Sequence, residues 1–250
     1  MIDSQEQFNP LAQNYVSSHV HRFGPSLPVL LDFAAPGRGD VALDIATGTG
    51  NTALALAPFV EKVTGIDLAT RMLEGARTRA LEEGVTNADF QIGSAERLPF
   101  ADSSFSLVTS RHAPHHFRDV PQFLSEVVRV LRPGGRFVMA DQITLEPHNQ
   151  AWVDAFQRTR DPSHHQQRTQ EEWQALTRAA GLTWTQNTLV PYRLEFQWWT
   201  QMSGCTPERV AALTALLETA PEEIRLERNP DGSPLAHHEP MLVVRLEKLK

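Results

Sequence analysis

A glycine turn between an apolar run and a helical pattern is the first part of this sequence suited to chemistry. The run Val-Ala-Leu-Asp-Ile at residues 41–45 is followed by Gly48 and Gly50. Glycine permits a sharp turn and lets a ligand approach the backbone, because no Cβ stands in the way. The helix that follows offers unpaired N–H groups in its first turn. The turn therefore indicates a ligand site, although Gly-x-Gly alone is a weak signal.

Two acidic residues narrow the class of ligand. Asp44 lies just before the turn, and Asp67 ends the next apolar run. A carboxylate at position 44 would repel a pyrophosphate but attract an amino or sulfonium group. A carboxylate at position 67 can accept hydrogen bonds from both hydroxyls of a ribose. The pair indicates a phosphate-free nucleoside with a cationic tail, which describes S-adenosylmethionine. The structural alternative is that each aspartate only caps a turn or a helix.

Alternating strands and helices must position these residues. Helix-length segments separate five apolar runs, at residues 41–45, 62–66, 89–92, 105–109 and 136–140. Helical spacing marks residues 70–83, 120–131, 170–180 and 207–218, and two further strands are expected at residues 182–189 and 241–246. This order predicts right-handed βαβ units. We expect a doubly wound α/β fold with a mostly parallel, Rossmann-like sheet of seven strands.

Composition restricts the classes of protein further. The chain has 250 residues, a mass of 28.0 kDa and a formal charge of −7, which favours one domain and argues against a nucleic-acid partner. Arg71, Arg77 and Arg79 lie at helical spacing and are expected on a solvated face. Cys205 is the single cysteine, residues 1–10 lack a signal-peptide core, and no run could span a membrane. A cytoplasmic protein is expected.

Five motifs in the same order and spacing resemble those of class I S-adenosylmethionine-dependent methyltransferases. The resemblance extends over about residues 15–141 and is strongest to the ubiquinone/menaquinone-biosynthesis type, also called methyltransferase type 11. The motifs are the glycine turn at residues 41–50, the acidic loop at 65–68, the adenine-side segment at 93–100, the strand 105–108 with His115-His116-Phe117, and the Pro-Gly-Gly turn within 131–137.

The resemblance implies that the cofactor is S-adenosyl-L-methionine, with S-adenosyl-L-homocysteine as the product. It implies that Asp44 lies near the methionine amino group, that Asp67 holds the ribose and that Tyr15 closes over the cofactor. Many relatives have aspartate where this chain has Ser94, so a modest affinity is expected. The implied cofactor-binding residues are Tyr15, Asp44, Ala46, Gly48, Thr49, Gly50, Asp67, Leu68, Met72, Ser94, Ala95, Glu96, Arg111 and His112.

Three residues are candidates for a catalytic base. Methyl transfer is an in-line displacement at a sulfonium, and an oxygen or nitrogen acceptor loses a proton that a histidine or carboxylate can take. His116 and Asp141 follow the fourth and fifth strands, and His148 lies in the next segment. For each of them a structural role is an equal alternative. Pro114 argues against a regular helix that would bring His112 and His116 onto one metal ion, so no metal is expected.

The predicted organisation is one methyltransferase domain over residues 1–250. Residues 1–35 are expected to form helices that cover the cofactor, and residues 40–141 the cofactor-binding core. Residues 145–168 and 192–237 interrupt the pattern and are expected to cover the acceptor site. Their aromatic side chains either line the acceptor pocket or pack the cover onto the sheet; they are Trp152, Phe156, Trp198 and Trp199.

The predicted function is transfer of a methyl group to a small-molecule acceptor, aromatic or apolar in part, by a monomer or a homodimer. A nicotinamide-dependent oxidoreductase is an alternative, because Gly48-x-Gly50-x-x-Ala53 permits it. Asp44, the Pro-Gly-Gly turn and the lack of a Tyr-x-x-x-Lys motif argue against it. A protein that binds S-adenosylmethionine without transferring its methyl group is the other alternative, because no catalytic base is unambiguous.

Overall fold

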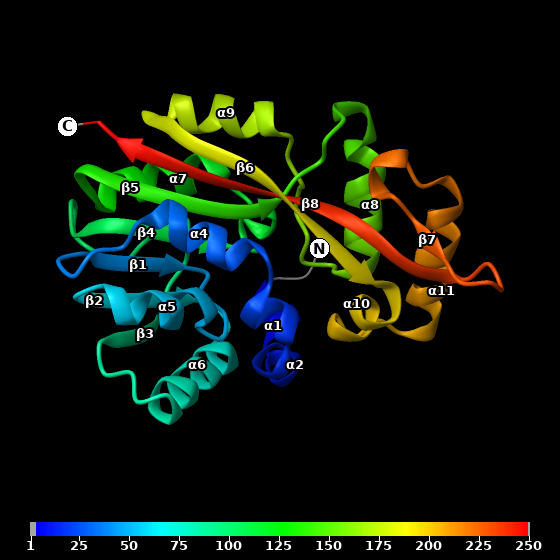
Figure 1. Ribbon diagram of the computed structural model, residues 1–250, viewed down its shortest axis with the longest axis horizontal. Helices are drawn as coiled ribbons and strands as arrows, with labels where there is room; N and C mark the ends of the chain where they lie inside the picture. The colour runs from blue at the N-terminus through cyan, green and yellow to red at the C-terminus, as the bar shows by residue number, and fades with distance from the viewer. Residues whose placement is uncertain (1–3, 250) are drawn as a thin grey trace.

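A mostly parallel sheet runs through the molecule (Figure 1). The computed structural model describes residues 4–249, apart from the side chains at positions 16, 17, 19 and 21. The strand order is β3-β2-β1-β4-β5-β8-β6, with β7 paired to β8. The strands are β1 (Val41–Ile45), β2 (Lys62–Asp67), β3 (Ala88–Ile92), β4 (Phe105–Arg111), β5 (Leu131–Gln142), β6 (Leu182–Glu195), β7 (Glu227–Arg228) and β8 (Pro234–Lys248).

The five strands β1 to β5 are parallel, and β8 and β6 add an antiparallel edge. The doubly wound, mostly parallel sheet expected from the sequence is confirmed; the two-residue β7 is an addition to its seven strands. Asp44 pairs with Gly65 on one side and with Thr109 on the other. Because the carboxyl ends of parallel strands share one edge, the residues that follow β1, β2, β4 and β5 meet there.

Helices cover both faces of the sheet, and each face has its own hydrophobic core. One face carries α4 (Ser26–Ala34), α5 (Asn51–Leu56) and α6 (Thr70–Glu82), and the other carries α7 (Val120–Val130) and α9 (Gln170–Ala179). In α7 the apolar residues recur every three or four positions, so Phe123, Leu124 and Val127 are all fully buried. Asp119 caps this helix by accepting a hydrogen bond from the Gln122 N–H at 2.9 Å.

Several element boundaries differ from the expected ones. β5 begins at Leu131, before the Pro-Gly-Gly turn, and its pairing with β4 contains an irregularity. β6 and β8 are much longer than expected, because they pair with each other from Leu182–Lys248 to Glu195–Ala236. The length of each strand is set by its pairing with the other, which is distant in the sequence, so the hydrophobic pattern of either segment alone does not predict it.

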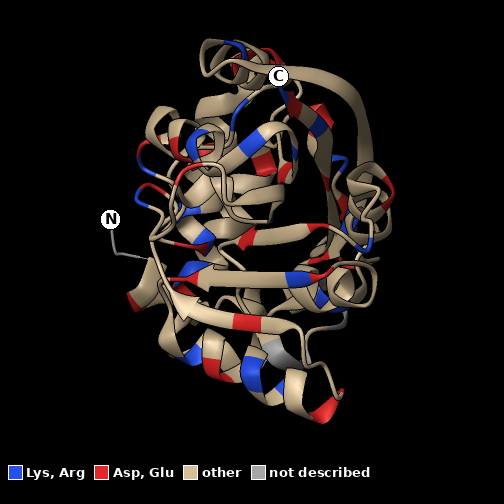
Figure 2. Cartoon of the chain, turned by 90° about the vertical axis from the view of Figure 1, so that its left-hand side faces the viewer, with Lys and Arg blue, Asp and Glu red and all other residues tan. Residues whose placement is uncertain are grey.

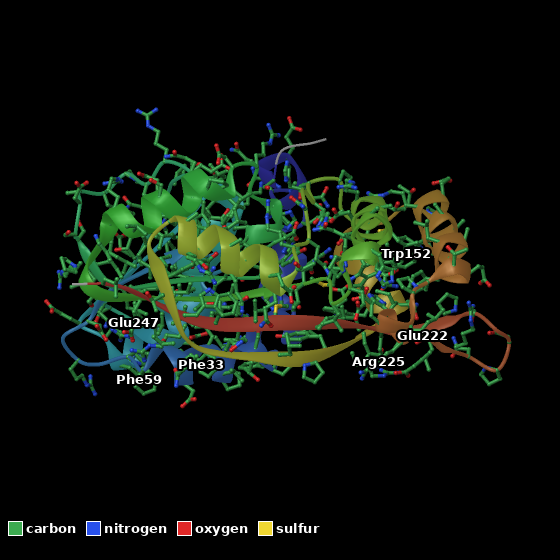
Figure 3. All side chains as sticks on the ribbon, turned by 90° about the horizontal axis from the view of Figure 1, so that it is seen from above. Phe33, Phe59, Trp152, Glu222, Arg225 and Glu247 are labelled. Carbon is green, nitrogen blue, oxygen red and sulfur yellow. The ribbon has the colours of Figure 1, made fainter. Side chains whose placement is uncertain are left out.

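The segments that interrupt the α/β pattern lie beyond the carboxyl ends of the parallel strands (Figure 1). They contain the helices α8 (Gln150–Arg160), α10 (Phe196–Met202) and α11 (Pro207–Leu216), of which only α11 was expected as a helix. Phe156 stacks between Trp152 and Trp199, with ring centroids 5.1 and 4.9 Å away. Figure 3 shows Trp152 at this end of the molecule, away from Phe33 and Phe59.

The N-terminal helices lie beside the same edge of the sheet. They are α1 (Ser4–Phe8), α2 (Ala12–Ser17) and α3 (His19–Phe23), and α2 packs against α6. Figure 2 shows positive and negative segments interspersed on the side of the molecule that it presents. Within residues 4–249, no helix has the length and apolar character needed to cross a membrane.

Candidate active site

A cavity of about 380 Å³ opens at the carboxyl edge of the sheet. It is lined from the ends of β1, β2, β4 and β5, from the N-terminal helices and from the segment that follows α8. The structure brings thirteen of the fourteen predicted cofactor residues to this cavity. They are Tyr15, Asp44, Ala46, Gly48, Thr49, Asp67, Leu68, Met72, Ser94, Ala95, Glu96, Arg111 and His112.

Asp44 is the most deeply buried acid of the cavity wall, with 2% of its surface exposed. Its carboxylate accepts hydrogen bonds from the hydroxyls of Thr47 at 2.6 Å and Thr109 at 2.7 Å. Burial raises the pKa of Asp44 to about 6, although both hydroxyls and the nearby Arg111 oppose the shift. The two hydroxyls fix the carboxylate at the base of the glycine turn.

Asp67 connects the glycine turn to the start of α6. Its Oδ2 accepts a hydrogen bond from the Gly48 N–H, and its Oδ1 accepts one from the Ala69 N–H, both at 2.8 Å. Each carboxylate oxygen keeps a second lone pair, so both oxygens can still accept from a ligand's hydroxyls. A Cβ on Gly48 would meet nothing within 4 Å, so the absence of a side chain there leaves room for a ligand.

Gly50 is the one predicted cofactor residue that the structure places elsewhere. It is absent from the cavity wall, and a Cβ on it would come within 3.0 Å of Ala76 and of the Phe90 ring. Its φ of 76° starts the turn into α5. Gly50 is therefore needed for close packing of the turn against α6 and β3, and its contact with the cofactor stays a prediction.

Two non-glycine residues of the cavity wall have left-handed backbones. Ala46 follows β1 and His112 follows β4, and each has a φ of 55°. Such a conformation costs on the order of 1 kcal/mol or more in an L-residue and concentrates at functional sites. The His112 N–H donates to the carbonyl of Ala140 at 2.8 Å, which holds the turn in place.

Aromatic residues of the N-terminal helices α1 and α2 line the cavity at the carboxyl edge of the sheet. Phe8 contacts both Tyr15 and His116 edge to face, with ring centroids 5.5 and 5.2 Å away. Tyr15 and Phe8 also pack against a small apolar cluster of Ala12, Ala69 and Met72. Burial raises the pKa of Tyr15 to about 12, so its phenol stays protonated at neutral pH.

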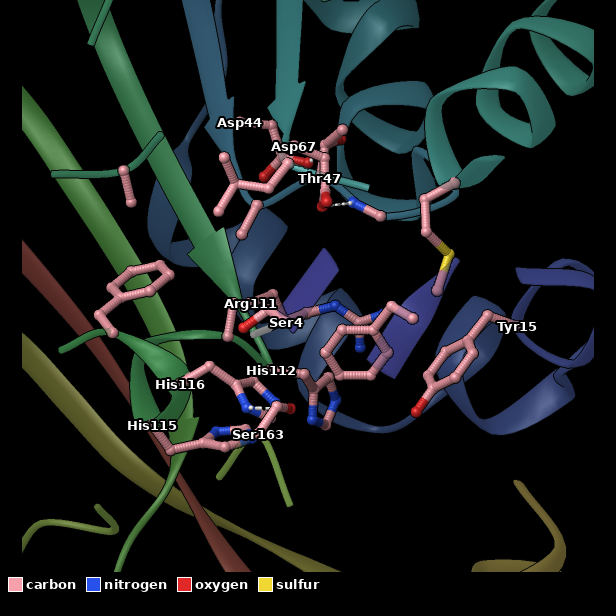
Figure 4. A pocket seen from close by; sticks show the side chains of 18 of the residues that line it. Ser4, Tyr15, Asp44, Thr47, Asp67, Arg111, His112, His115, His116 and Ser163 are labelled. Atoms are coloured by element: carbon pink, nitrogen blue, oxygen red, sulfur yellow. Dashed lines mark hydrogen bonds between the residues drawn. The ribbon is translucent and has the colours of Figure 1, made fainter. Parts of the chain in front are cut away.

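The opposite end of the cavity carries two buried histidines. Figure 4 shows His115, His116 and Ser163 grouped there, away from Asp44 and Asp67. The short 3-10 turn η2 (Pro114–His116) after β4 places both imidazoles. Burial lowers the pKa values of both histidines far below the usual range, so both are neutral at pH 7.

Each of these histidines is oriented through a carboxylate. His115 Nδ1 lies 2.6 Å from Asp141 Oδ1. His116 Nδ1 lies 3.2 Å from Ser163 Oγ, and that hydroxyl donates to Asp161 at 2.6 Å. Because the Ser163 proton points to Asp161, Ser163 accepts from His116 Nδ1–H and leaves the Nε2 lone pair of His116 available.

The three predicted catalytic residues have different positions. His116 lines the cavity, whereas Asp141 lies behind His115 and is absent from the wall. Burial raises the pKa of Asp141 to about 7. His148 is exposed in the 3-10 turn η3 (Pro147–Asn149), and the structure does not bring it to the cavity. Among the described residues, no group of three or more potential ligands could hold a metal ion.

The aromatic residues named as possible acceptor walls do not line the cavity within the described chain. Trp152, Phe156 and Trp199 stack on one another, which favours the alternative that they pack the cover. Three other residues of the expected cover 145–168 do line the cavity, although the sequence analysis did not name them as site residues. They are Arg160, Asp161 and Ser163. Gln142 was also missed, although its place after the fifth strand is a signal that could have found it.

Comparisons with known proteins agree with this geometry. A family model described as "Methyltransferase domain" matches residues 43–139. The uncharacterized methyltransferase YcgJ of Bacillus subtilis (strain 168) is 34% identical over 240 residues, which cover 94% of this chain and 95% of that protein. This chain belongs to the class I S-adenosylmethionine-dependent methyltransferases. The demethylmenaquinone methyltransferase of Symbiobacterium thermophilum is 37% identical over 142 residues, which cover 54% of this chain and 57% of that protein.

Solved structures confirm the methyltransferase fold. The crystal structure of YcgJ from Bacillus subtilis matches with a TM-score of 0.84 over 90% of this chain and 98% of that chain, at 34% identity. A crystal structure from Bacillus halodurans C-125 matches with a TM-score of 0.86 over 91% of this chain and 100% of that chain, at 28% identity. None of the matches favours the oxidoreductase alternative.

The cavity of this methyltransferase fits S-adenosylmethionine. Gly48 leaves space for close approach, and the buried hydroxyl of Thr49 has no partner within the described chain, so it is available to a ligand. Asp44 and Asp67 offer carboxylate oxygens to an amino group and to ribose hydroxyls. Glu96 also lines the cavity, but its Oε1 accepts from the backbone N–H groups of residues 118 and 119 and so helps to fix the start of α7.

Proposed function

We propose that this enzyme methylates a small molecule at an atom whose proton passes to His116 as the new bond forms, when that proton becomes acidic enough for a weakly basic imidazole to accept it. The observation that carries the proposal is one cavity that joins the glycine turn to a neutral, oriented histidine. S-adenosylmethionine, when bound, supplies an electrophilic methyl group. The acceptor's lone pair forms the new bond to the methyl carbon, the carbon–sulfur bond breaks with its electron pair left on sulfur, and S-adenosylhomocysteine results.

The residues at the acceptor end have separate roles in this proposal. His116 Nε2 takes the proton that the acceptor loses, because Ser163 and Asp161 hold the imidazole in the required tautomer. His115, paired with Asp141, lies beside His116 with the ring centroids 4.1 Å apart. Phe8 covers the His116 ring and helps to keep water from the site.

The acceptor class that this arrangement favours is a small molecule with an ionisable hydroxyl. The space is lined by side chains and has the size of a small-ligand site. Several relatives are named demethylmenaquinone methyltransferase or ubiquinone/menaquinone biosynthesis C-methyltransferase, which makes phenols and hydroquinones the first acceptors to test.

The test is methyl transfer from isotope-labelled S-adenosylmethionine to a panel of phenols, hydroquinones, amines and thiols. We expect labelled product from a hydroxyl-bearing acceptor, and a kcat roughly 10²- to 10⁴-fold lower in His116→Gln with unchanged S-adenosylhomocysteine affinity. Cofactor binding without product from any acceptor would contradict the proposal and favour the non-methylating alternative.

A further inference from the structure

Gln142 is a buried donor at the acceptor end for which the proposed mechanism has no use. It is the last residue of β5, only 6% of its surface is exposed, and it is one of the residues that line the cavity. Its Nε2 is buried and donates to no other described residue. Native proteins pair the large majority of such groups, because a buried donor without a partner is destabilising.

The position of Gln142 separates it from the cofactor end. It lies at the carboxyl end of β5, two positions beyond Ala140, the β5 residue that pairs with Arg111. The ends of β1 and β2, which carry the two cofactor carboxylates, lie across β4 from β5. A ligand atom that pairs with Gln142 therefore lies at the β5 end of the cavity, which the proposed function assigns to the acceptor.

We infer that Gln142 is a specificity-determining residue whose Nε2–H donates a hydrogen bond to an oxygen of the acceptor. This inference rests on the proposed function and adds to it the class of acceptor. The acceptor carries, besides the hydroxyl that loses its proton to His116, a second oxygen with a free lone pair, such as a carbonyl. An acceptor without that oxygen leaves the Gln142 donor unpaired.

Burial of an unpaired atom does not by itself make a site, and the chain contains a matched control. Gln167 is 2% exposed, and its Oε1 is likewise buried without a partner in the described chain. Gln167 does not line the cavity. The two glutamines share residue type and burial, and differ in that only Gln142 lines the cavity.

The experiment measures how the protein, saturated with S-adenosylhomocysteine, binds the three isomeric hydroxybenzaldehydes and the three matching methylphenols by calorimetry. Each pair differs by a carbonyl group in place of a methyl group. We expect at least one aldehyde to bind the parent about threefold to tenfold more tightly than its methylphenol. Gln142→Met and Gln142→Glu should lose this preference, and Gln167→Met should keep it, with S-adenosylhomocysteine affinity unchanged in all.

Three results would overturn the assignment. In the first, the parent protein binds no aldehyde more tightly than its methylphenol, or binds none of these compounds. In the second, the preference for the aldehyde persists in Gln142→Met. In the third, Gln142→Met loses as much affinity for S-adenosylhomocysteine as for the aldehyde, which would place Gln142 at the cofactor. A melting curve checks that each variant is folded, and Gln142→Glu retains the side-chain shape. A preference that depends on Gln142, without methyl transfer to any acceptor, would refute the proposed function but leave the donor assignment standing.

Discussion

Protonation of Asp44 is expected to control cofactor affinity. The carboxylate attracts the ligand's amino group only when it is ionised, and burial raises its pKa to about 6. At pH 7 about nine-tenths of the free protein carries the carboxylate, and at pH 5 about one-tenth does. The affinity for S-adenosylhomocysteine should therefore fall about tenfold, or ~1.4 kcal/mol, between pH 7 and pH 5.

Two variants isolate the contribution of Asp44. Burial also raises the pKa of Asp67, so part of the pH dependence can come from that residue. Asp44→Asn removes only the Asp44 part, and the difference between the parent and this variant should be the tenfold change. Thr109→Val removes a hydroxyl that donates to the Asp44 carboxylate at 2.7 Å. It should raise the midpoint by roughly one pH unit, because a hydrogen bond to a charged group contributes about 1.5 kcal/mol or more.

Calorimetric titration with S-adenosylhomocysteine at several pH values between 5 and 8 is the assay. The histidines near the acceptor end do not titrate in this range, because burial lowers their pKa values far below it. The reasoning fails if the parent and Asp44→Asn show the same pH dependence. It also fails if Thr109→Val leaves the midpoint in place or lowers it.

Three further changes test other parts of the structure. Gly65→Ala should lower the melting temperature by a few degrees, since its Cβ would lie 2.8 Å from the Thr47 side chain and overpacking costs about 1–3 kcal/mol; an unchanged Tm contradicts this. Tyr192→Phe should lose about 1–3 kcal/mol in urea unfolding, because the Ser26 N–H donates to the phenol oxygen at 3.0 Å; an unchanged midpoint contradicts that bond. Burial raises the pKa of Asp141 to about 7, so we expect the methyl-transfer rate to rise near pH 7 as Asp141 ionises beside His115; Asp141→Asn should remove this rise, and an unaltered pH–rate profile would contradict it.

The sheet and the cofactor end were predictable because their signals are local. The apolar run 41–45 became β1 with the same bounds, since a strand covered on both faces must be apolar throughout. The positions of Asp44 and Asp67 in the cavity wall were predictable because both residues lie at the carboxyl ends of their strands, β1 and β2. For β1 and for the two aspartates, the structure is determined mainly by residues that are also close in the sequence.

Sequence reasoning was less informative where the position of a residue depends on distant packing. The spacing of Gly48 and Gly50 shows where the chain turns, but not that a Cβ on Gly50 would meet Ala76 and Phe90. Arg79 was expected on a solvated helix face, yet it is 5% exposed and donates to the Thr49 carbonyl at 2.8 Å. Its place three residues after the buried Ala76 was a helical signal that could have indicated burial.

The acceptor end could not be assembled from sequence for a different reason. Ser163 orients His116 across 47 residues, and the backbone N–H of His165 donates to the carbonyl of His115 at 2.9 Å. Such contacts join segments whose spacing carries no repeating pattern, so neither could be read from periodicity. Ser163 lies within residues 145–168, which the sequence indicated only as a cover over the acceptor site.

The most direct test of the central claim is the affinity of S-adenosylhomocysteine for Asp44→Asn/Asp67→Asn, compared with the parent by calorimetry at pH 7.5. Both carboxylates line the cavity at the glycine turn, so removal of both charges should weaken binding by roughly 100-fold or more. Circular dichroism should confirm that the variant retains the fold, since Asp67 also accepts from two backbone N–H groups. A folded variant that binds the ligand as tightly as the parent would contradict the account.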